Sequence, residues 1–205
     1  MTASAPPARP TVVAIWLIVA GVIGWWAAFQ LTLEKLNQIA NPGAKASCDF
    51  SVLVQCGKNL DSLQGSLLGF PNPILGLTGW VAPIVVGVAI LAGARFSAWF
   101  WILFAGGVFL AFCFVVWLIT ESIFTLGTLC PWCMVTWVVT IPTFYLVVLH
   151  ILRSEILPVP PSAASFGRAL MPWVPLMALL SYVVVGVIAE LRLDVVAELS
   201  RKLTG

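Results

Sequence analysis

The sequence predicts an all-α membrane protein with five transmembrane helices. Of its 205 residues, 61% are hydrophobic and only 9% are charged. Soluble domains carry about 25% charged residues, so this composition is typical of an integral membrane protein. Five separate apolar runs have about the length needed to cross a hydrocarbon layer of roughly 30 Å. The formal net charge of +2 is small and scattered, which argues against a nucleic-acid partner.

The chain begins with a polar, proline-rich stretch over residues 1–10, where we expect a short disordered tail. The apolar run over residues 11–33 follows. It is longer than the apolar core of a signal peptide, which has about 7–15 residues, and it lacks a small-residue cleavage site. We therefore expect it to be retained as the first transmembrane span.

Residues 34–73 form a long polar loop between the first and second spans. Asp61 or Ser62 is placed to cap a short helix inside it. The Pro-Asn-Pro sequence at 71–73 would end that helix, because each proline disfavours helical geometry in the residue before it. We expect this amphipathic helix to lie on the membrane rather than to cross it. Its apolar residues recur at helical spacing: Leu60, Leu63, Leu67 and Phe70.

The second half of the chain is expected to hold the other four spans. Arg95 marks a tight turn between the second and third runs, and residues 121–129 form a short link into the fourth. Residues 151–169, with several prolines, are expected to be a flexible linker. Residues 170–205 would hold the fifth span and a tail. The four runs cover roughly 74–94, 98–120, 131–149 and 170–191.

Five spans place the two ends of the chain on opposite sides of the membrane. The loop over 34–73, the start of the fourth span and the C-terminus then share one side. The positive-inside rule leaves the orientation open, because an N-terminus inside leaves more Lys and Arg outside than inside. Disulfides persist in oxidising compartments, so the chemistry of the cysteines favours their side as the extracytoplasmic one.

Cys130 and Cys133 form a Cys-Pro-Trp-Cys motif at the start of the fourth span. Proline is favoured at the first helical position, which puts Cys130 at the N-cap and Cys133 one turn into the helix. The positive end of the helix dipole lowers the pKa of a thiol there. The motif therefore indicates a redox-active dithiol at the membrane boundary. Half of a zinc site is the alternative, but four-cysteine zinc sites usually have two tight pairs.

A second pair, Cys48 and Cys56, lies in the polar loop on the same side. A mobile, exposed pair can exchange with a soluble partner and with the fixed pair, whereas the fixed pair borders the lipid, where a quinone could dock. A plain structural disulfide is the alternative. Cys113, inside an apolar run, is expected to be a small buried residue. Asn72 either bonds the local backbone or donates a hydrogen bond to a carbonyl ligand.

The order and spacing of these motifs are quite specific. They are the Cys48/Cys56 pair, Ser62, Asn72-Pro-Ile-Leu-Gly76 and Cys130-Pro-Trp-Cys133. In this arrangement the chain resembles a bacterial, stand-alone member of the vitamin K epoxide reductase family. The resemblance implies a four-helix bundle as the catalytic core over residues 11–150, with one additional helix after it. It also implies a multi-pass protein of the bacterial cytoplasmic membrane, with its cysteines on the extracytoplasmic face.

The resemblance implies distinct roles for the four cysteines. Cys48 would exchange with a DsbA-like thioredoxin-fold protein, and Cys56 would pass the electrons to Cys130. Cys133 would act next to a quinone, either menaquinone or ubiquinone, without a metal. Because the chain ends at Gly205 with no thioredoxin domain, the partner is expected to be a separate protein.

Three residues are expected from the resemblance to line the quinone site. Asn72 would donate a hydrogen bond to a quinone carbonyl, and Ser62 would help to shape the pocket. Trp137 stands where the animal enzymes have a ligand-contacting tyrosine, and its indole donates a hydrogen bond but accepts none. The expected function is that of a membrane thiol:quinone oxidoreductase, embedded in the lipid bilayer, that supports disulfide formation in exported proteins.

Three other functions were weighed. A quinone or vitamin K epoxide reductase would use the same cysteines, but its purpose would be to produce the reduced quinone. A disulfide-bond protein B analogue also joins two cysteine pairs to a quinone, but in that family the Cys-x-x-Cys pair precedes the spaced pair. A metal-binding membrane protein would use the thiols as ligands.

Overall fold

The computed structural model describes residues 10–43, 45–154 and 158–204, and almost all of this part is helical. The only β pairing in these residues is a single bridge between Val54 and Leu129. The elements in chain order are α1 (Thr11–Ala40), α2 (Gly57–Asp61), η1 (Leu63–Ser66), α3 (Asn72–Gly79), α4 (Val81–Leu91), α5 (Ala98–Thr120), η2 (Glu121–Leu126), α6 (Pro131–Arg153), α7 (Pro161–Leu170), η3 (Met171–Trp173), α8 (Val174–Leu193) and α9 (Val195–Thr204).

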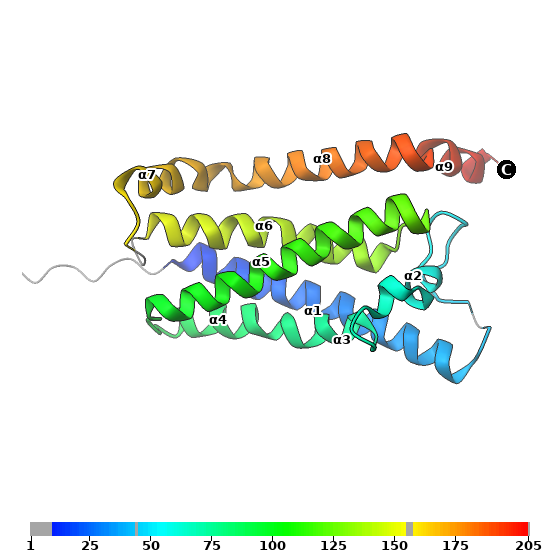
Figure 1. Cartoon of the computed structure of the whole chain (residues 1–205), viewed down its shortest axis with the longest axis horizontal. Helices are drawn as coiled ribbons and strands as arrows, with labels where there is room; N and C mark the ends of the chain where they lie inside the picture. The colour runs from blue at the N-terminus through cyan, green and yellow to red at the C-terminus, as the bar shows by residue number, and fades with distance from the viewer. Residues whose placement is uncertain (1–9, 44, 155–157, 205) are drawn as a thin grey trace, which may run out of the picture.

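Five helical stretches of the described chain are long and apolar enough to cross a membrane, which confirms the predicted fold class. α1 and α6 are each one span. The second span combines α3 with α4, the third combines α5 with η2, and the fifth runs from α7 through α8. The long helices lie side by side along one direction (Figure 1).

The bundle is built around α1 and α6. α1 packs on α3, α4 and α6, whereas α5 and α8 both pack on α6. Small residues allow α1 and α4 to approach closely: a Cβ atom added at Gly87 would lie only 2.6 Å from the carbonyl oxygen of Ala14. Between α1 and α6, the indole nitrogen of Trp16 donates a hydrogen bond of 2.9 Å to the hydroxyl of Thr143.

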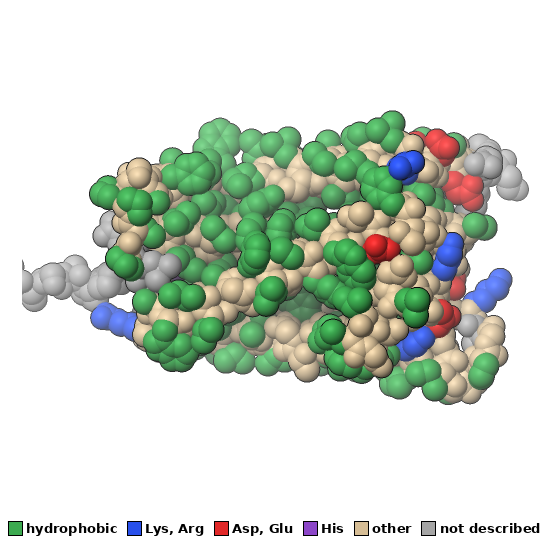
Figure 2. All heavy atoms as spheres, in the orientation of Figure 1, with side chains coloured by type: hydrophobic (Ala, Val, Ile, Leu, Met, Phe, Trp, Pro, Cys, Tyr) green, Lys and Arg blue, Asp and Glu red, His purple; other side chains and the backbone are tan. Residues whose placement is uncertain are grey.

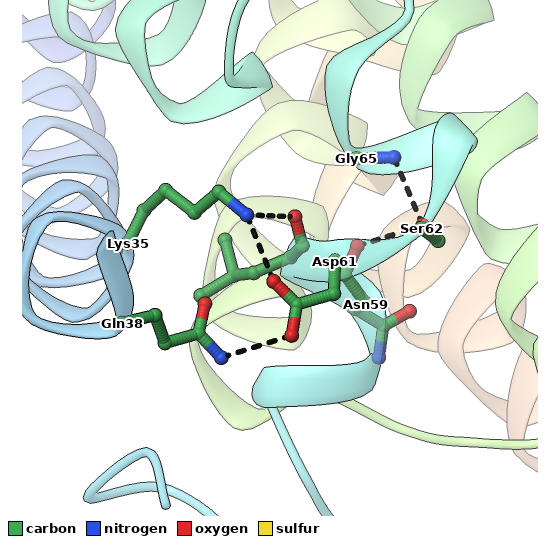
Figure 3. A network of polar contacts seen from close by, with 7 residues as sticks. Lys35, Gln38, Asn59, Asp61, Ser62 and Gly65 are labelled. Atoms are coloured by element: carbon green, nitrogen blue, oxygen red, sulfur yellow. Dashed lines mark hydrogen bonds and ion pairs between the residues drawn. The ribbon is translucent and has the colours of Figure 1, made fainter. Parts of the chain in front are cut away.

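The first helix is longer than predicted, since it continues to Ala40 rather than ending near residue 33. The extra turns of α1 are joined to α2 by hydrogen bonds. The ammonium group of Lys35 donates to the carbonyl oxygen of Leu60 at 3.0 Å and to the carboxylate of Asp61 at 2.8 Å (Figure 3). The amide of Gln38 donates to the same carboxylate at 3.4 Å. The start of the predicted loop is therefore a helical arm that supports α2.

The predicted single amphipathic helix in this loop is wrong. Two short turns, α2 and η1, take its place, and they are separated at Ser62, which has an extended backbone (φ −75°, ψ 158°). Ser62 does act as a cap, because its hydroxyl accepts a 3.0 Å hydrogen bond from the backbone N–H of Gly65 (Figure 3). The extended cap residue interrupts the helical spacing of the leucines, so they do not share one helix face.

Two predicted connections are also helical. In the link over 121–129, η2 continues α5 as a π-helical turn and ends at Gly127, which has a left-handed backbone (φ 64°). The prediction of a flexible linker over 151–169 is wrong for α7, which packs on α6. Residues 155–157 of that linker, and the predicted tail apart from Pro10, lie outside the described residues.

The four cysteines of the two pairs share one end of the bundle, which we call the cysteine end. It holds the loop over 41–56, α2, the start of α6 and α9, and it lies on the right in Figure 1. On the face seen in Figure 2, Lys, Arg, Asp and Glu side chains gather at this end, and the flank of the bundle is mostly hydrophobic. This distribution suits a bundle that crosses a membrane.

Candidate functional site

Cys130 is the N-cap residue of α6, as its sequence context predicts. Its sulfur accepts a hydrogen bond of 3.4 Å from the backbone N–H of Cys133, and Pro131 occupies the first helical position. A hydrogen bond from the Cys133 side chain is the main cause that lowers the pKa of Cys130 below its ordinary value. Burial acts in the opposite direction, and the backbone N–H groups of Cys133 and Trp132 add to the lowering. The lowered pKa favours the thiolate form of Cys130, which is the form that reacts in exchange.

The loop pair forms a disulfide, and this disulfide touches the other pair. Cys48 and Cys56 are bonded, with their Cα atoms 5.7 Å apart. The sulfur of Cys130 lies 3.3 Å from the sulfur of Cys56, although the two residues are 74 positions apart in the chain. Cys133 packs against the same cluster of buried residues. The structure therefore brings the four cysteines together, with Cys56 at the contact between the pairs.

The loop is held closely against the start of α6. The Asp49 carboxylate accepts hydrogen bonds from the backbone N–H groups of Cys56 at 2.7 Å and Gly57 at 3.0 Å. The backbone N–H of Gln55 donates to the carbonyl oxygen of Leu129, next to Cys130, at 3.1 Å. The expectation that the Cys48/Cys56 pair is mobile and exposed is therefore wrong, because these hydrogen bonds hold the loop in place.

In the described structure the loop disulfide is buried. Cys48 is 4% exposed and Cys56 is 0% exposed. A protein partner can reach Cys48 only if the loop first opens, since thiol–disulfide exchange requires direct contact between the sulfurs.

An apolar cavity of about 730 Å³ lies beside Cys133. Of the four cysteines in the cluster, Cys133 alone lines it, so the cavity meets the relay at the end farthest from the loop disulfide. The volume is in the range of small-molecule sites, and the apolar walls with a few polar groups are typical of such sites. Its polar lining residues are Asn59, Ser62, Gln64, Asn72, Glu121, Ser122, Thr136, Thr140 and Thr143.

The three residues expected at a quinone site all line this cavity. Asn72 bonds the local backbone: its amide nitrogen donates to the carbonyl oxygen of Gln64 at 2.6 Å, and its oxygen accepts from the N–H of Leu67 at 3.2 Å. Ser62 is occupied as the cap of η1. Trp137 is 5% exposed, and its indole N–H has no hydrogen-bond partner among the described residues.

Gln64 and Glu121 are among the polar residues of the cavity that sequence reasoning missed. The amide of Gln64 donates a hydrogen bond of 3.1 Å to the carboxylate of Glu121, and both side chains line the cavity. Glu121 was read only as the beginning of a link, and no sequence signal marks either residue. Cys113 is a further correction, because it is exposed on α5 rather than buried. Hydrophobicity alone does not reveal which face of an apolar helix points outward.

The additional helix α8 packs against the part of α6 that carries the site. Its Ala189 belongs to one buried cluster with Trp137 and Leu129, and Cys133 packs against that cluster. The hydroxyl of Tyr182 donates to the carbonyl oxygen of Val138 in α6 at 2.6 Å. α8 therefore packs against the helix that carries Cys133 and Trp137.

A membrane-spanning helical bundle in which a disulfide contacts a Cys-x-x-Cys dithiol defines a class, the membrane thiol–disulfide oxidoreductases. A sequence model described as the vitamin K epoxide reductase family matches residues 15–148. The chain therefore belongs to the vitamin K epoxide reductase family, which is associated with quinones. The matched range includes most of α1, all of α2 to α5 and most of α6, with the four cysteines of the relay. No curated protein matches the sequence.

A metal site was also considered for the thiols. Within the ranges that the structure describes, no three His, Cys, Asp or Glu side chains are grouped so that they could hold a metal ion.

Proposed function

We propose that this protein is a membrane thiol:quinone oxidoreductase that reoxidises a separate DsbA-like thioredoxin-fold partner. It would act at the extracytoplasmic face of a bacterial cytoplasmic membrane and so support disulfide formation in exported proteins. The observation that carries the proposal is the order of the sulfurs: the Cys48–Cys56 disulfide, then Cys130 at 3.3 Å from Cys56, then Cys133 at the cavity.

The relay begins at the loop pair. A thiolate of the partner attacks Cys48, so the Cys48–Cys56 bond breaks and Cys56 leaves as a thiolate. The second thiol of the partner resolves the mixed disulfide, which oxidises the partner and releases Cys48. The loop now holds two electrons as a dithiol.

The electrons then pass to the fixed pair. Cys56 attacks Cys130 of a Cys130–Cys133 disulfide, and Cys133 leaves as a thiolate. Cys48 next attacks Cys56, which restores the loop disulfide and frees Cys130. The described arrangement matches this state, because the loop disulfide is formed while Cys130 and Cys133 are free thiols. The lowered pKa of Cys130 makes it a good leaving group in this step.

The last transfer takes place at the cavity. Cys130 and Cys133 form a disulfide, and the two electrons that they lose reduce a quinone to a quinol. Cys133 is the thiol that lines the cavity, and the unpaired indole N–H of Trp137 is a donor for a quinone carbonyl. Asn72 has a second amide hydrogen beyond the one it gives to Gln64, which suits the same role.

Anaerobic mixing of the reduced, lipid-embedded protein with a menaquinone or ubiquinone analogue tests the proposal, with quinone absorbance and thiol state followed together. Wild type should form quinol and the Cys130–Cys133 disulfide. Cys133→Ala should abolish both, because no other thiol of the relay lines the cavity. Cys113→Ala is the matched control and should behave as wild type, since Cys113 lies on the exposed face of α5.

The same assay separates the two halves of the relay. Cys48→Ala should leave the fixed pair able to reduce the quinone but should block oxidation of a DsbA-like partner. Retained quinone reduction in Cys133→Ala would overturn the assignment of the cavity-facing thiol. Stoichiometric zinc in the purified protein, without a redox-active disulfide, would overturn the function itself.

A further inference from the structure

Glu121 places a carboxyl group on the wall of the cavity. Among the described residues, Glu121 and Cys133 are the two ionisable side chains that line this cavity. It lies where α5 passes into the π-helical turn η2. Such turns are rare and frequently occur at functional sites. Glu121 is partly buried, so its carboxyl group borders the cavity without being sealed from the surroundings.

The proposed reaction requires protons at the cavity as well as electrons. Reduction of a quinone to a quinol consumes two electrons and two protons. Cys130 and Cys133 supply the electrons, but Cys130 does not line the cavity, so its thiol hydrogen cannot pass directly to a quinone there. The other polar lining groups are hydroxyls, amides and an indole, which do not release protons at neutral pH. A carboxylate can take a proton from water and pass it on.

We propose that Glu121 is the proton donor for quinone reduction in this cavity. The Glu121 carboxylate takes a proton from water and passes it to one quinone oxygen, and the thiol hydrogen of Cys133 passes to the other, as the Cys130–Cys133 bond forms and the electron pair moves to the quinone. The thiol proton of Cys130 goes to water, so the two protons that the cysteines lose equal the two that the quinol gains. This inference rests on the proposed function, because it names a catalytic residue of that reaction.

The hydrogen bonds of the cavity wall support this role. The side-chain amide of Gln64 donates to the Glu121 carboxylate at 3.1 Å, and the backbone carbonyl of the same Gln64 accepts from Asn72 at 2.6 Å. The carboxyl group and the amide proposed to bind a quinone carbonyl are therefore joined through one residue. This arrangement places a proton donor and a carbonyl-binding group on the same wall.

The charged groups that face η2 make their contacts elsewhere on this turn. From α2, the ammonium group of Lys58 donates to the carbonyl oxygen of Leu126 at 2.6 Å. From α8, the guanidinium carbon of Arg192 lies 4.8 Å from the ring centre of Phe124. From α6, Cys133 is the other ionisable side chain that lines the cavity.

Glu121→Gln tests the inference, because glutamine keeps an oxygen that accepts from Gln64 but cannot take up and release a proton. Glu190→Gln is the matched control. Glu190 is also partly buried at the cysteine end, accepts a hydrogen bond of 2.9 Å from the N–H of Val196, and does not line the cavity. The rate of quinone reduction by the pre-reduced proteins is measured over a range of pH.

The expected result is a rate for Glu121→Gln that is lower by roughly 100-fold, the typical contribution of general acid catalysis. The pH profile of the rate should be the same in wild type and Glu190→Gln and should differ in Glu121→Gln. Transfer from the loop pair to the Cys130–Cys133 pair, measured without quinone, should be equal in all three proteins.

Two results would overturn the inference while the proposed function stands. One is a Glu121→Gln protein with the wild-type rate and pH profile. The other is a parallel loss of quinone reduction and of transfer between the cysteine pairs, which would make Glu121 a purely structural residue. If wild type itself fails to reduce any quinone, the proposed function falls, and this inference falls with it.

Discussion

The backbone N–H of Cys56 donates a hydrogen bond of 2.7 Å to the carboxylate of Asp49. The residue that follows one cysteine of the loop disulfide thus holds the backbone of the other. The same carboxylate also accepts from the N–H of Gly57 at 3.0 Å and from that of Ala46 at 3.3 Å. Asp49 is therefore the centre of the loop that presents Cys56 to Cys130.

Asp49→Ala should affect the disulfide in two opposite ways. Electron transfer from the loop pair to Cys130 should slow by roughly tenfold or more, because hydrogen bonds to a charged group contribute ~1.5–3 kcal/mol. Reduction of the loop disulfide by a small phosphine should become faster, since the loop opens more often. Rapid-mixing measurements of both reactions check the prediction.

Ser51→Ala is the control for Asp49→Ala. The hydroxyl of Ser51 accepts a hydrogen bond of 2.9 Å from the N–H of Val54 in the same loop, without holding either cysteine. Its replacement should change both rates little. Equal effects of the two substitutions would show that Asp49 has no special part in presenting Cys56.

The pKa of Cys130 gives a second prediction. In a variant in which Cys48, Cys56 and Cys113 are replaced by alanine, Cys130 should titrate below the pKa of an ordinary cysteine. Because the pKa is lowered, the thiolate appears at lower pH and persists at all higher pH. Additional replacement of Cys133 by alanine removes the main cause of the lowering, so the midpoint should rise.

The ultraviolet absorbance of the thiolate, followed over pH, measures this midpoint. Cys133→Ser is the informative control, because its hydroxyl still donates a hydrogen bond to the sulfur of Cys130. Its midpoint should lie below that of Cys133→Ala. A midpoint that is the same in all three proteins would mean that Cys133 does not stabilise the Cys130 thiolate.

Trp137→Phe gives a third prediction, since it removes a buried indole N–H that has no partner in the described structure. No hydrogen bond of the free protein is lost, so its stability should fall only through the smaller ring. If the indole binds a quinone carbonyl, the KM for quinone should rise by about fivefold, as expected for one hydrogen bond of ~1 kcal/mol.

Trp101→Phe controls for the loss of a buried indole. Trp101 is also buried but belongs to the cluster at the α1–α4–α6 core and does not line the cavity. It should lower the unfolding temperature without changing the KM for quinone. An unchanged KM in Trp137→Phe would remove Trp137 from the quinone site.

Much of the fold follows from local properties of the chain. The five spans are predictable because a run of apolar side chains of the right length is sufficient to identify a membrane helix. The start of α6 at Pro131 is predictable for the same kind of reason, since proline suits the first helical position. The break at Ser62 and the helix α7 were not predicted, because they depend on how short segments pack on the bundle.

Five membrane spans and two cysteine pairs on one side of the membrane can be predicted from the amino-acid sequence alone. The packed fold is needed to see that Cys56 contacts Cys130, that the loop disulfide is buried, and that Glu121 lines the cavity with Cys133. Hydropathy and capping signals act over a few neighbouring residues. The contact between two sulfurs 74 positions apart depends instead on the packing of α1 and α6 and on hydrogen bonds such as those of Asp49.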